Sequence, residues 1–208
     1  PDDVSSAPTD LSDAWERFWA TFVTREGMVR TESGRNDGSS ALQGDAMLHA
    51  VWMQDREAFD RLWHWTRTRL ERTLPAGPTR PRDALYARHW AGGAVTDWSN
   101  DAGADQRIAG ALMLASRTWR EPAYAAAATD TLAAVLEKSA ISSNRLGVAF
   151  EPTLTPTGQS AVVTTGRTLV PTLMRAFAEG ARQGVWHWLI DGTYSTLMRA
   201  AAQESPLR

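Results

Sequence analysis

The chain has 208 residues and a formal net charge of −2, with 43% hydrophobic and 22% charged residues. This length can bury one substantial core, and the slight acidity argues against nucleic acid or an anionic membrane surface as the main partner. The chain contains no cysteine, which excludes disulfides and thiolate metal sites. No apolar run in the sequence is long enough for a membrane span.

Apolar residues recur with a helical period over most of the chain. The first such stripe follows Thr9 and Asp10, which we predict to cap its helix. Asp55 is a second candidate cap, and Pro122 occupies a position typical of the first turn of a helix. The predicted helices cover residues 11–25, 46–53, 56–70, 105–119, 122–136, 170–181 and 186–202.

Segments rich in Gly, Pro, Ser and Asn separate these helices and are predicted to be loops. They cover residues 27–40, 74–81, 91–103 and 139–158. Apart from a short extended piece around residues 148–150, no stretch indicates a convincing sheet. The predicted fold class is therefore all-α, with helices joined into antiparallel pairs. Residues 1–10 are predicted to be a flexible leader, and residues 11–208 a single domain.

Tryptophan is the compositional outlier, with ten residues against three tyrosines and five phenylalanines. An indole offers a broad apolar face and an N–H donor, which suits stacking on sugar rings. The alternative is that most of these side chains belong to the core. The four histidines have no metal-ligand spacing, so the sequence predicts no metal site.

Two stretches carry a family pattern. Residues 40–66 begin SALQGDAMLHAVW and end FDRLWHWT, and residues 85–112 begin LYARHW and end IAGAL. Both resemble glycoside hydrolase family 8, the bacterial cellulase family, which reads Ser-Glu-Gly-Gln and Phe-Asp-x-Leu-Trp-x-Trp-Thr in the first stretch. The second resembles the family's Leu-Phe-Ala-Trp-Arg-Trp and Ile-Ala-Tyr-Ala-Leu. The similarity covers about residues 11–204 and is nearest to the endoglucanases that accompany bacterial cellulose synthase.

The resemblance implies a partial or reduced (α/α)6-barrel-like helical toroid built from helical hairpins, with a groove for β-1,4-glucan and no cofactor. Family members invert stereochemistry with one carboxylic acid that protonates the leaving oxygen and one carboxylate that activates water. By the same resemblance, the residues expected to contact substrate are Gln43, Trp52, Arg88, Trp90 and Trp98.

The catalytic positions depart from the family pattern. The family's acid, a glutamate, corresponds to Ala41, which has no proton to give. The family's Asp-Gly-Asp corresponds to residues 103–105, where only Asp105 remains. Asp45 stands where the family has tyrosine, and Arg88 replaces a tryptophan that would form a sugar platform. These losses lie on the expected groove, while scaffold positions are kept.

Two further departures concern the second half of the chain. Residues 165–168 replace the family's Asn-Pro-Ser-Tyr, and the sequence ends at Arg208, before the segment in which the family is expected to carry its base. A barrel with seven or eight helices would leave apolar helix faces uncovered. We therefore expect a smaller ring, a homo-oligomer in which a second subunit supplies the missing wall, or a native protein longer than these 208 residues.

Three functional hypotheses follow. The first is a catalytically degenerate protein that binds glucan, or assists assembly, in bacterial cellulose or exopolysaccharide production, with β-glucan or cellulose-synthesis proteins as partners. The alternative is an active endo-β-1,4-glucanase with displaced acids Asp45 and Asp105. The third is an interaction domain that uses the former groove as a protein surface. Family resemblance implies a periplasmic or secreted location.

Overall fold

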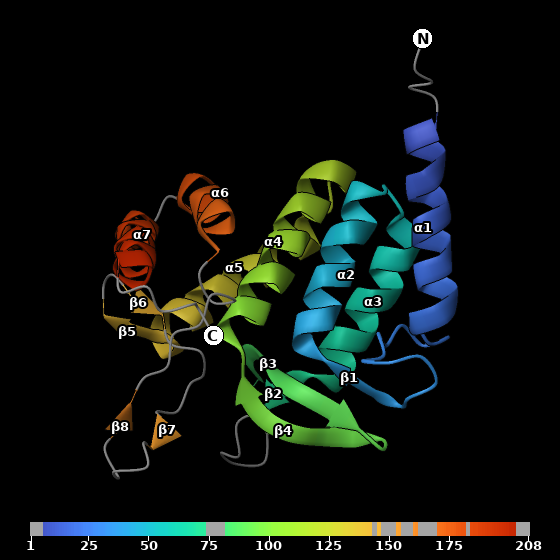
Figure 1. Ribbon diagram of the computed structural model, residues 1–208, viewed down its shortest axis with the longest axis horizontal. Coiled ribbons are helices and arrows are strands. Elements are labelled where there is room, and N and C mark those ends of the chain that lie inside the picture. The colour runs from blue at the N-terminus through green and yellow to red at the C-terminus, as the bar shows by residue number, and fades with distance from the viewer. Residues whose placement is uncertain are drawn as a thin grey trace.

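The computed structural model describes residues 6–73, 82–142, 145–146, 153–154, 160–161, 170–181 and 184–202. Helices dominate these residues (Figure 1), which confirms the predicted all-α fold class. The described part of the chain contains seven helices: α1 (Ser6–Phe22), α2 (Ser40–Trp52), α3 (Arg56–Arg69), α4 (Ala102–Trp119), α5 (Pro122–Lys138), α6 (Pro171–Ala181) and α7 (Val185–Ala202).

Local capping chemistry explains where the middle helices start. Asp55 accepts a hydrogen bond from the backbone N–H of Ala58 at 2.9 Å and caps α3, as predicted. Pro122 is the first residue of α5, where its missing N–H removes no helical hydrogen bond. Asp101 caps α4 by accepting two backbone N–H bonds. Because of this cap, α4 begins before residue 105, where the sequence pattern placed its start.

Like α4, α1 and α2 begin earlier than predicted. The structure places the start of α1 at Ser6, inside the predicted leader, so Thr9 and Asp10 lie within the helix and do not cap it. Similarly, α2 begins at Ser40 rather than at residue 46. Its first turn reads Ser-Ala-Leu-Gln and lacks an obvious apolar stripe. Apolar periodicity therefore located both helices but not their first turns.

The prediction missed a small antiparallel sheet. Strand β3 (Arg82–Ala91) pairs with each of the other three strands, β1 (Asp37–Ser39), β2 (Glu71–Thr73) and β4 (Ala94–Asn100). Gly92 and Gly93 join β3 to β4 with φ angles of 61° and 97°, which suit a two-residue hairpin turn. This Gly-Gly pair was the local signal for a hairpin in a segment predicted to be a loop.

Four shorter strands follow α5 and form two separate pairs. Strand β5 (Ala140–Ser142) pairs with β6 (Arg145–Leu146), and β7 (Thr153–Leu154) pairs with β8 (Ser160–Ala161). The extended piece predicted around residues 148–150 lies outside the described residues, as do residues 165–168.

The helices are arranged as predicted, in antiparallel pairs. β1 leads directly into α2 and β4 leads into α4, so both helices start at the sheet. α3 returns toward it and is followed by β2. The last residue of α5, Lys138, reaches the same sheet by donating from Nζ to the carbonyl of Asp83 on β3. In Figure 1, α1 lies at one side of the molecule and α6 and α7 lie at the other, with α2 to α5 between them.

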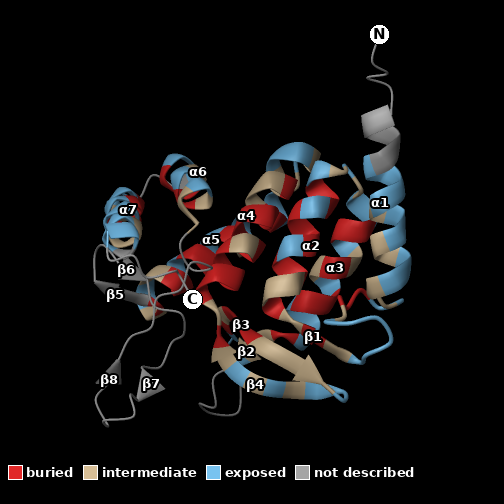
Figure 2. Cartoon of the chain, in the orientation of Figure 1, coloured by how far each residue is buried: buried red, intermediate tan, exposed pale blue. Residues whose placement is uncertain are grey.

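The central contact is between α2 and α4. A Cβ on Gly44 would lie 3.0 Å from the Cβ of Arg107, so glycine permits this close approach. One core cluster joins α1 to α5, and a second joins α5, α6 and α7 around Phe177 and Trp186, whose ring centroids are 5.0 Å apart. Figure 2 shows the buried residues concentrated on α2 and α4. None of the described helices is both long enough and apolar enough to cross a membrane.

Candidate functional site at the sheet end of α2 and α4

The sequence-predicted catalytic positions lie near the sheet end of two neighbouring helices. Ser39 caps α2 by accepting a hydrogen bond from the backbone N–H of Leu42 at 3.3 Å. Ala41, in the first turn, contributes only a methyl group. Beside it, Ser40 is completely buried, and its hydroxyl has no hydrogen-bond partner among the described residues. The first turn of α2 therefore presents no carboxyl group.

Asp45 lies one turn further along α2. Its Oδ1 is 3.1 Å from Nε of Arg107 on α4, and its side chain is 51% exposed. It also lines an apolar pocket of about 300 Å³ between α1 and α2. The other lining residues are Leu11, Ala14, Trp15, Phe18, Val29, Leu42, Ala46, His49 and Met53. The ion pair gives Asp45 a role in joining α2 to α4.

Asp105 lies in the first turn of α4 and is completely buried. Its Oδ1 accepts the backbone N–H of Tyr86 at 3.1 Å, and its Oδ2 accepts the side-chain amide of Asn100 at 2.8 Å. Burial raises the pKa of Asp105 to about 8, because lost hydration outweighs these two bonds, which favour the ionised form. A raised pKa suits a general acid, but a side chain without exposed surface cannot touch a substrate.

The raised pKa of Asp105 makes folding stability pH-dependent. Between about pH 4 and about pH 8 the folded chain keeps Asp105 protonated, while the unfolded chain ionises it. The folded state then binds more protons, so we expect the contribution of this group to stability to fall as the pH rises through that window. Urea unfolding of the wild type and of Asp105→Asn across the window measures the contribution. Parallel pH profiles for the two proteins would contradict it.

Asn100 was not singled out from the sequence, yet it connects the strands to the helices. Besides bonding Asp105, its Nδ2 donates to Oγ of Ser139 at 3.2 Å, at the end of α5. Its carbonyl oxygen accepts a hydrogen bond from Nη2 of Arg88 at 3.1 Å. The available signal was its position, directly before an aspartate that caps a helix. Through these hydrogen bonds, Asn100 and Asp105 connect the β3–β4 hairpin to α4.

Arg88 lies across the β3–β4 hairpin. Its Nη1 is 4.0 Å from the carboxylate of Asp97, and its side chain is 38% exposed. Burial by itself raises the pKa of Asp97, but hydrogen bonds from the hydroxyl and amide of Ser99, together with the positive charges of Arg88 and His89, lower it overall. The ionised Asp97 therefore holds the guanidinium of Arg88 at the surface. From there, this guanidinium can also donate hydrogen bonds to a ligand.

The two hairpin tryptophans differ in exposure. Exposed and partly buried residues alternate along β4, and Trp98 is on the exposed side with 54% of its surface accessible. Trp90, on β3, is partly buried, and its ring packs edge-on against Trp65 with centroids 5.6 Å apart. Trp98 is therefore the available aromatic platform, whereas Trp90 anchors the hairpin to α3.

The structure separates Trp52 from this group. Trp52 is the last residue of α2, so it lies about 16 Å from Ala41 along the helix axis. Its ring contacts His49 edge-on and is 63% exposed. Trp52 and Trp98 were both expected to contact substrate, but α2 carries Trp52 away from the sheet, whereas Trp98 lies on β4.

Gln43 is also placed differently from the prediction. It is completely buried, its Oε1 accepts the backbone N–H of Val29 at 2.6 Å, and its Nε2 donates to the Gly27 carbonyl at 3.1 Å and to Oγ1 of Thr66 at 2.9 Å. All of these partners belong to the protein interior. The predicted substrate contact is therefore replaced by a structural role, which holds the segment after α1 against α2 and α3.

The described residues contain no group of three or more His, Asp or Glu side chains that could hold a metal ion. What the site offers is an exposed indole and a guanidinium–carboxylate pair on the hairpin. Beside them, at the sheet end of α2 and α4, lie a methyl group and a buried carboxyl group. This arrangement can bind a ligand with apolar faces and hydroxyl groups, and among the described residues Asp45 is the exposed carboxylate near Ala41, paired with Arg107.

Comparison with known proteins supports the resemblance found in the sequence. The chain matches the sequence model of glycosyl hydrolases family 8 over residues 4–207. It is 32% identical over 130 residues to an endoglucanase of Cellulomonas uda, a match that covers 62% of this chain and 34% of that protein. An endoglucanase of Escherichia coli strain K12 is 32% identical over 133 residues, covering 61% and 33% of the two chains.

Solved structures resemble the fold. Endoglucanase Cel10 of Klebsiella pneumoniae superimposes with a TM-score of 0.73 at 26% identity, covering 88% of this chain and 57% of that one. The endo-β-1,4-glucanase CMCax of Acetobacter xylinum gives a TM-score of 0.76 at 23% identity, covering 90% and 57%. The match thus spans about a third of the length of the curated relatives and just over half of these solved chains.

Proposed function

Because the chain belongs to glycosyl hydrolase family 8, we propose that it binds a β-glucan through the β3–β4 hairpin and does not cleave it. The observation that carries this proposal is the methyl group of Ala41 at the position of the family's catalytic acid. General acid–base assistance is typically worth about 10²–10⁴-fold in rate. A chain without the proton donor therefore retains little of the family's hydrolysis.

The competing hypothesis is an active endoglucanase with Asp45 and Asp105 as displaced acids. An inverting pair must face a shared water molecule across the glycosidic bond. Asp105 has no exposed surface from which to do so, and its two oxygens accept hydrogen bonds from the chain itself. Asp45 is exposed but pairs with Arg107. These positions favour binding without cleavage.

The hairpin supports the choice of a β-glucan as ligand. Trp98 exposes an indole face that suits the C–H face of a pyranose ring. The partly exposed Arg88–Asp97 pair, on the same hairpin, supplies donors and acceptors for hydroxyl groups. Two structural relatives are described as an endo-β-1,4-glucanase and a β-1,3-1,4-glucanase. Both names specify β-linked glucose polymers, so the proposed ligand is a chain of this class.

The cellular role proposed for this binding is support of bacterial cellulose or exopolysaccharide production in the periplasm or outside the cell. It rests on the resemblance to endoglucanases that accompany cellulose synthase, and it makes cellulose-synthesis proteins possible partners alongside the glucan. Self-association is a separate proposal, supported by the apolar pocket between α1 and α2. Sedimentation over a range of protein concentrations tests it, and a compact monomer throughout would rule it out.

Two measurements on the purified chain test the proposed function. Incubated with soluble cellulose or cello-oligosaccharides, the protein should release no reducing ends above background. Calorimetric titration should show glucan binding that Trp98→Ala weakens about tenfold, the loss expected for one aromatic contact. Trp52→Ala is the matched control, because Trp52 is also more than half exposed but lies at the end of α2 that is remote from the sheet. Its affinity should equal that of the wild type.

Different outcomes decide between the hypotheses. Release of reducing ends that Asp45→Asn abolishes would support the displaced-acid endoglucanase and reject the non-catalytic reading. Equal weakening by Trp98→Ala and Trp52→Ala would contradict the hairpin as the binding surface. If neither cleavage nor binding is detected, the interaction-domain hypothesis is favoured.

A further inference from the structure

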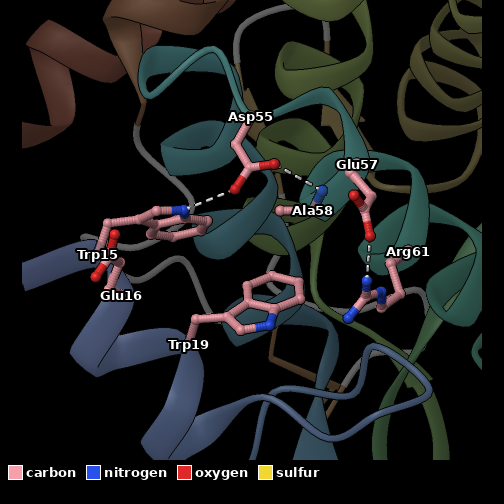
Figure 3. Close-up of a pocket in the computed structure, with 7 residues that line it drawn as sticks. All are labelled: Trp15, Glu16, Trp19, Asp55, Glu57, Ala58 and Arg61. Atoms are coloured by element: carbon pink, nitrogen blue, oxygen red, sulfur yellow. Dashed lines mark hydrogen bonds and ion pairs between the residues drawn. The ribbon is translucent and has the colours of Figure 1, made fainter. Parts of the chain in front are cut away.

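A pocket of about 270 Å³ lies between α1 and the first turn of α3 (Figure 3). No residue of the β3–β4 hairpin lines it. Because α3 begins where α2 has run away from the sheet, this pocket is near the opposite end of the helices from Ala41. None of the substrate-contacting positions implied by the family resemblance lines it. The lining residues are Trp15, Glu16, Trp19, Asp55, Glu57, Ala58 and Arg61.

Two indoles on α1 form the aromatic side of the pocket. The ring centroids of Trp15 and Trp19 are 5.8 Å apart and the planes are inclined at 52°. The Trp15 indole N–H donates to Oδ2 of Asp55 at 3.0 Å, which fixes the orientation of that ring. Figure 3 shows both rings facing the first turn of α3. Arg61 covers one face of Trp19 and Phe18 stacks on Trp15, so the remaining indole surface is what suits the apolar C–H face of a sugar ring.

The opposite side of the pocket supplies hydrogen-bonding groups. Asp55 uses each carboxylate oxygen once, toward Trp15 and toward the N–H of Ala58. Arg61 donates from Nη2 to Glu57 Oε1 at 2.6 Å. A carboxylate oxygen can accept more than one hydrogen bond, and a guanidinium has five N–H donors. The wall therefore offers both acceptors and donors, as a polyhydroxyl ligand requires.

The pocket is poorly suited to a cationic ligand, although aromatic rings and carboxylates together can form cation sites. The guanidinium of Arg61 already lies over the Trp19 ring, 5.4 Å from its centroid. The same guanidinium balances the charge of Glu57. Glu16 and Asp55 also line the pocket, so its charge does not exclude a cation, but Arg61 already covers the Trp19 ring face on which a ligand cation would make its aromatic contact.

We propose that the pocket between α1 and α3 binds one saccharide ring of a neutral glycan, as a second carbohydrate site separate from the hairpin. Its volume is just below the range of about 300–1,000 Å³ typical of drug-sized ligands, which fits a single ring better than a chain segment. This second-site proposal rests on the proposed function only in that a glucan is chosen as the probe. A second site lets one protein contact a glucan at two points or bridge two chains.

The test is a titration of the full chain, labelled with 5-fluorotryptophan, with cellotetraose. Fluorine signals of Trp15, Trp19 and Trp98 are assigned from single Trp→Phe variants. The Trp15 and Trp19 signals should shift in a saturable way. Glu57→Gln, at a side chain that is 84% exposed, should weaken this response about three- to tenfold by removing a charged acceptor. Glu16→Gln, also exposed, provides a second variant that leaves the core intact.

The signals separate this proposal from the proposed function. Shifts of Trp15 and Trp19 without a shift of Trp98 would support the second site while rejecting the hairpin. A shift of Trp98 alone, up to the solubility limit of cellotetraose, would overturn the second site only. Tetramethylammonium acting on Trp15 and Trp19 at lower concentrations than cellotetraose would also overturn it, because the pocket would then be a cation site. Glu179→Gln, on α6, is the matched control and should leave all three responses unchanged.

Discussion

Replacing Gln43 with leucine will lower the free energy of unfolding by about 2–5 kcal/mol. Leucine fills nearly the same volume but leaves the buried N–H of Val29 and the carbonyl of Gly27 without their partner. Each buried polar group left unsatisfied costs about 1–3 kcal/mol. Urea or thermal unfolding of the purified variant measures the loss.

Asp45→Asn is the control for this substitution, because it lies on the same helix but removes only a half-exposed ion pair. Such pairs are worth about 0–1 kcal/mol. The experiment also distinguishes the structural role of Gln43 from the substrate contact implied by the family pattern. If Gln43→Leu weakened glucan binding and left unfolding unchanged, the structural role would be wrong.

Replacing Gly27 with alanine will destabilise the protein by about 3 kcal/mol or more. Gly27 has a φ of +99°, and an added Cβ would lie 2.4 Å from the carbonyl oxygen of Arg61. Positive φ costs an L-residue about 1–2 kcal/mol, and overpacking against a backbone atom that cannot swing away adds about 1–3 kcal/mol. Chemical unfolding followed by circular dichroism measures the change.

Gly34→Ala separates the two contributions at Gly27. Gly34 also has a positive φ, of +82°, but an added Cβ would have no neighbour within 4 Å. Its replacement should therefore cost only the conformational part, about 1–2 kcal/mol. Equal losses for the two glycines would show that the contact with Arg61 is relieved at little cost. Because Gly27 also accepts a hydrogen bond from Gln43, the double variant should lose less than the sum of the single ones.

The helical part of the fold could be predicted because it is encoded locally. Trp15, Phe18, Trp19 and Phe22 form a stripe that only a helix brings to one face, and Asp55 and Pro122 mark starts by their own capping chemistry. The sheet was missed because β3 also pairs with β1 and β2, which are separated from it in sequence, and only its pairing with β4 is local. Its one strong local signal was the Gly92–Gly93 pair.

The candidate site was only partly predictable, since exposure is a property of the folded chain. Trp98 and Trp52 look equivalent in the sequence, and both are exposed, yet one lies on the hairpin and the other at the far end of α2. Asp105 was a candidate acid on the basis of its motif, but the structure surrounds it with Tyr86 and Asn100. The pocket of Trp15 and Trp19 combines α1 with α3, which no sequence pattern links.

The family, the succession of helices and the absence of a carboxyl group at residue 41 can be read directly from the amino-acid sequence, because they depend on residue identity and short-range spacing. Which polar residues reach solvent is a property of the packed fold. Gln43 and Asp105 are buried, and each accepts a hydrogen bond from a backbone N–H, of Val29 and of Tyr86 respectively. Buried backbone N–H and C=O groups require such partners wherever water is excluded. That requirement depends on contacts between distant segments, so it becomes visible only after the helices and the sheet have packed together.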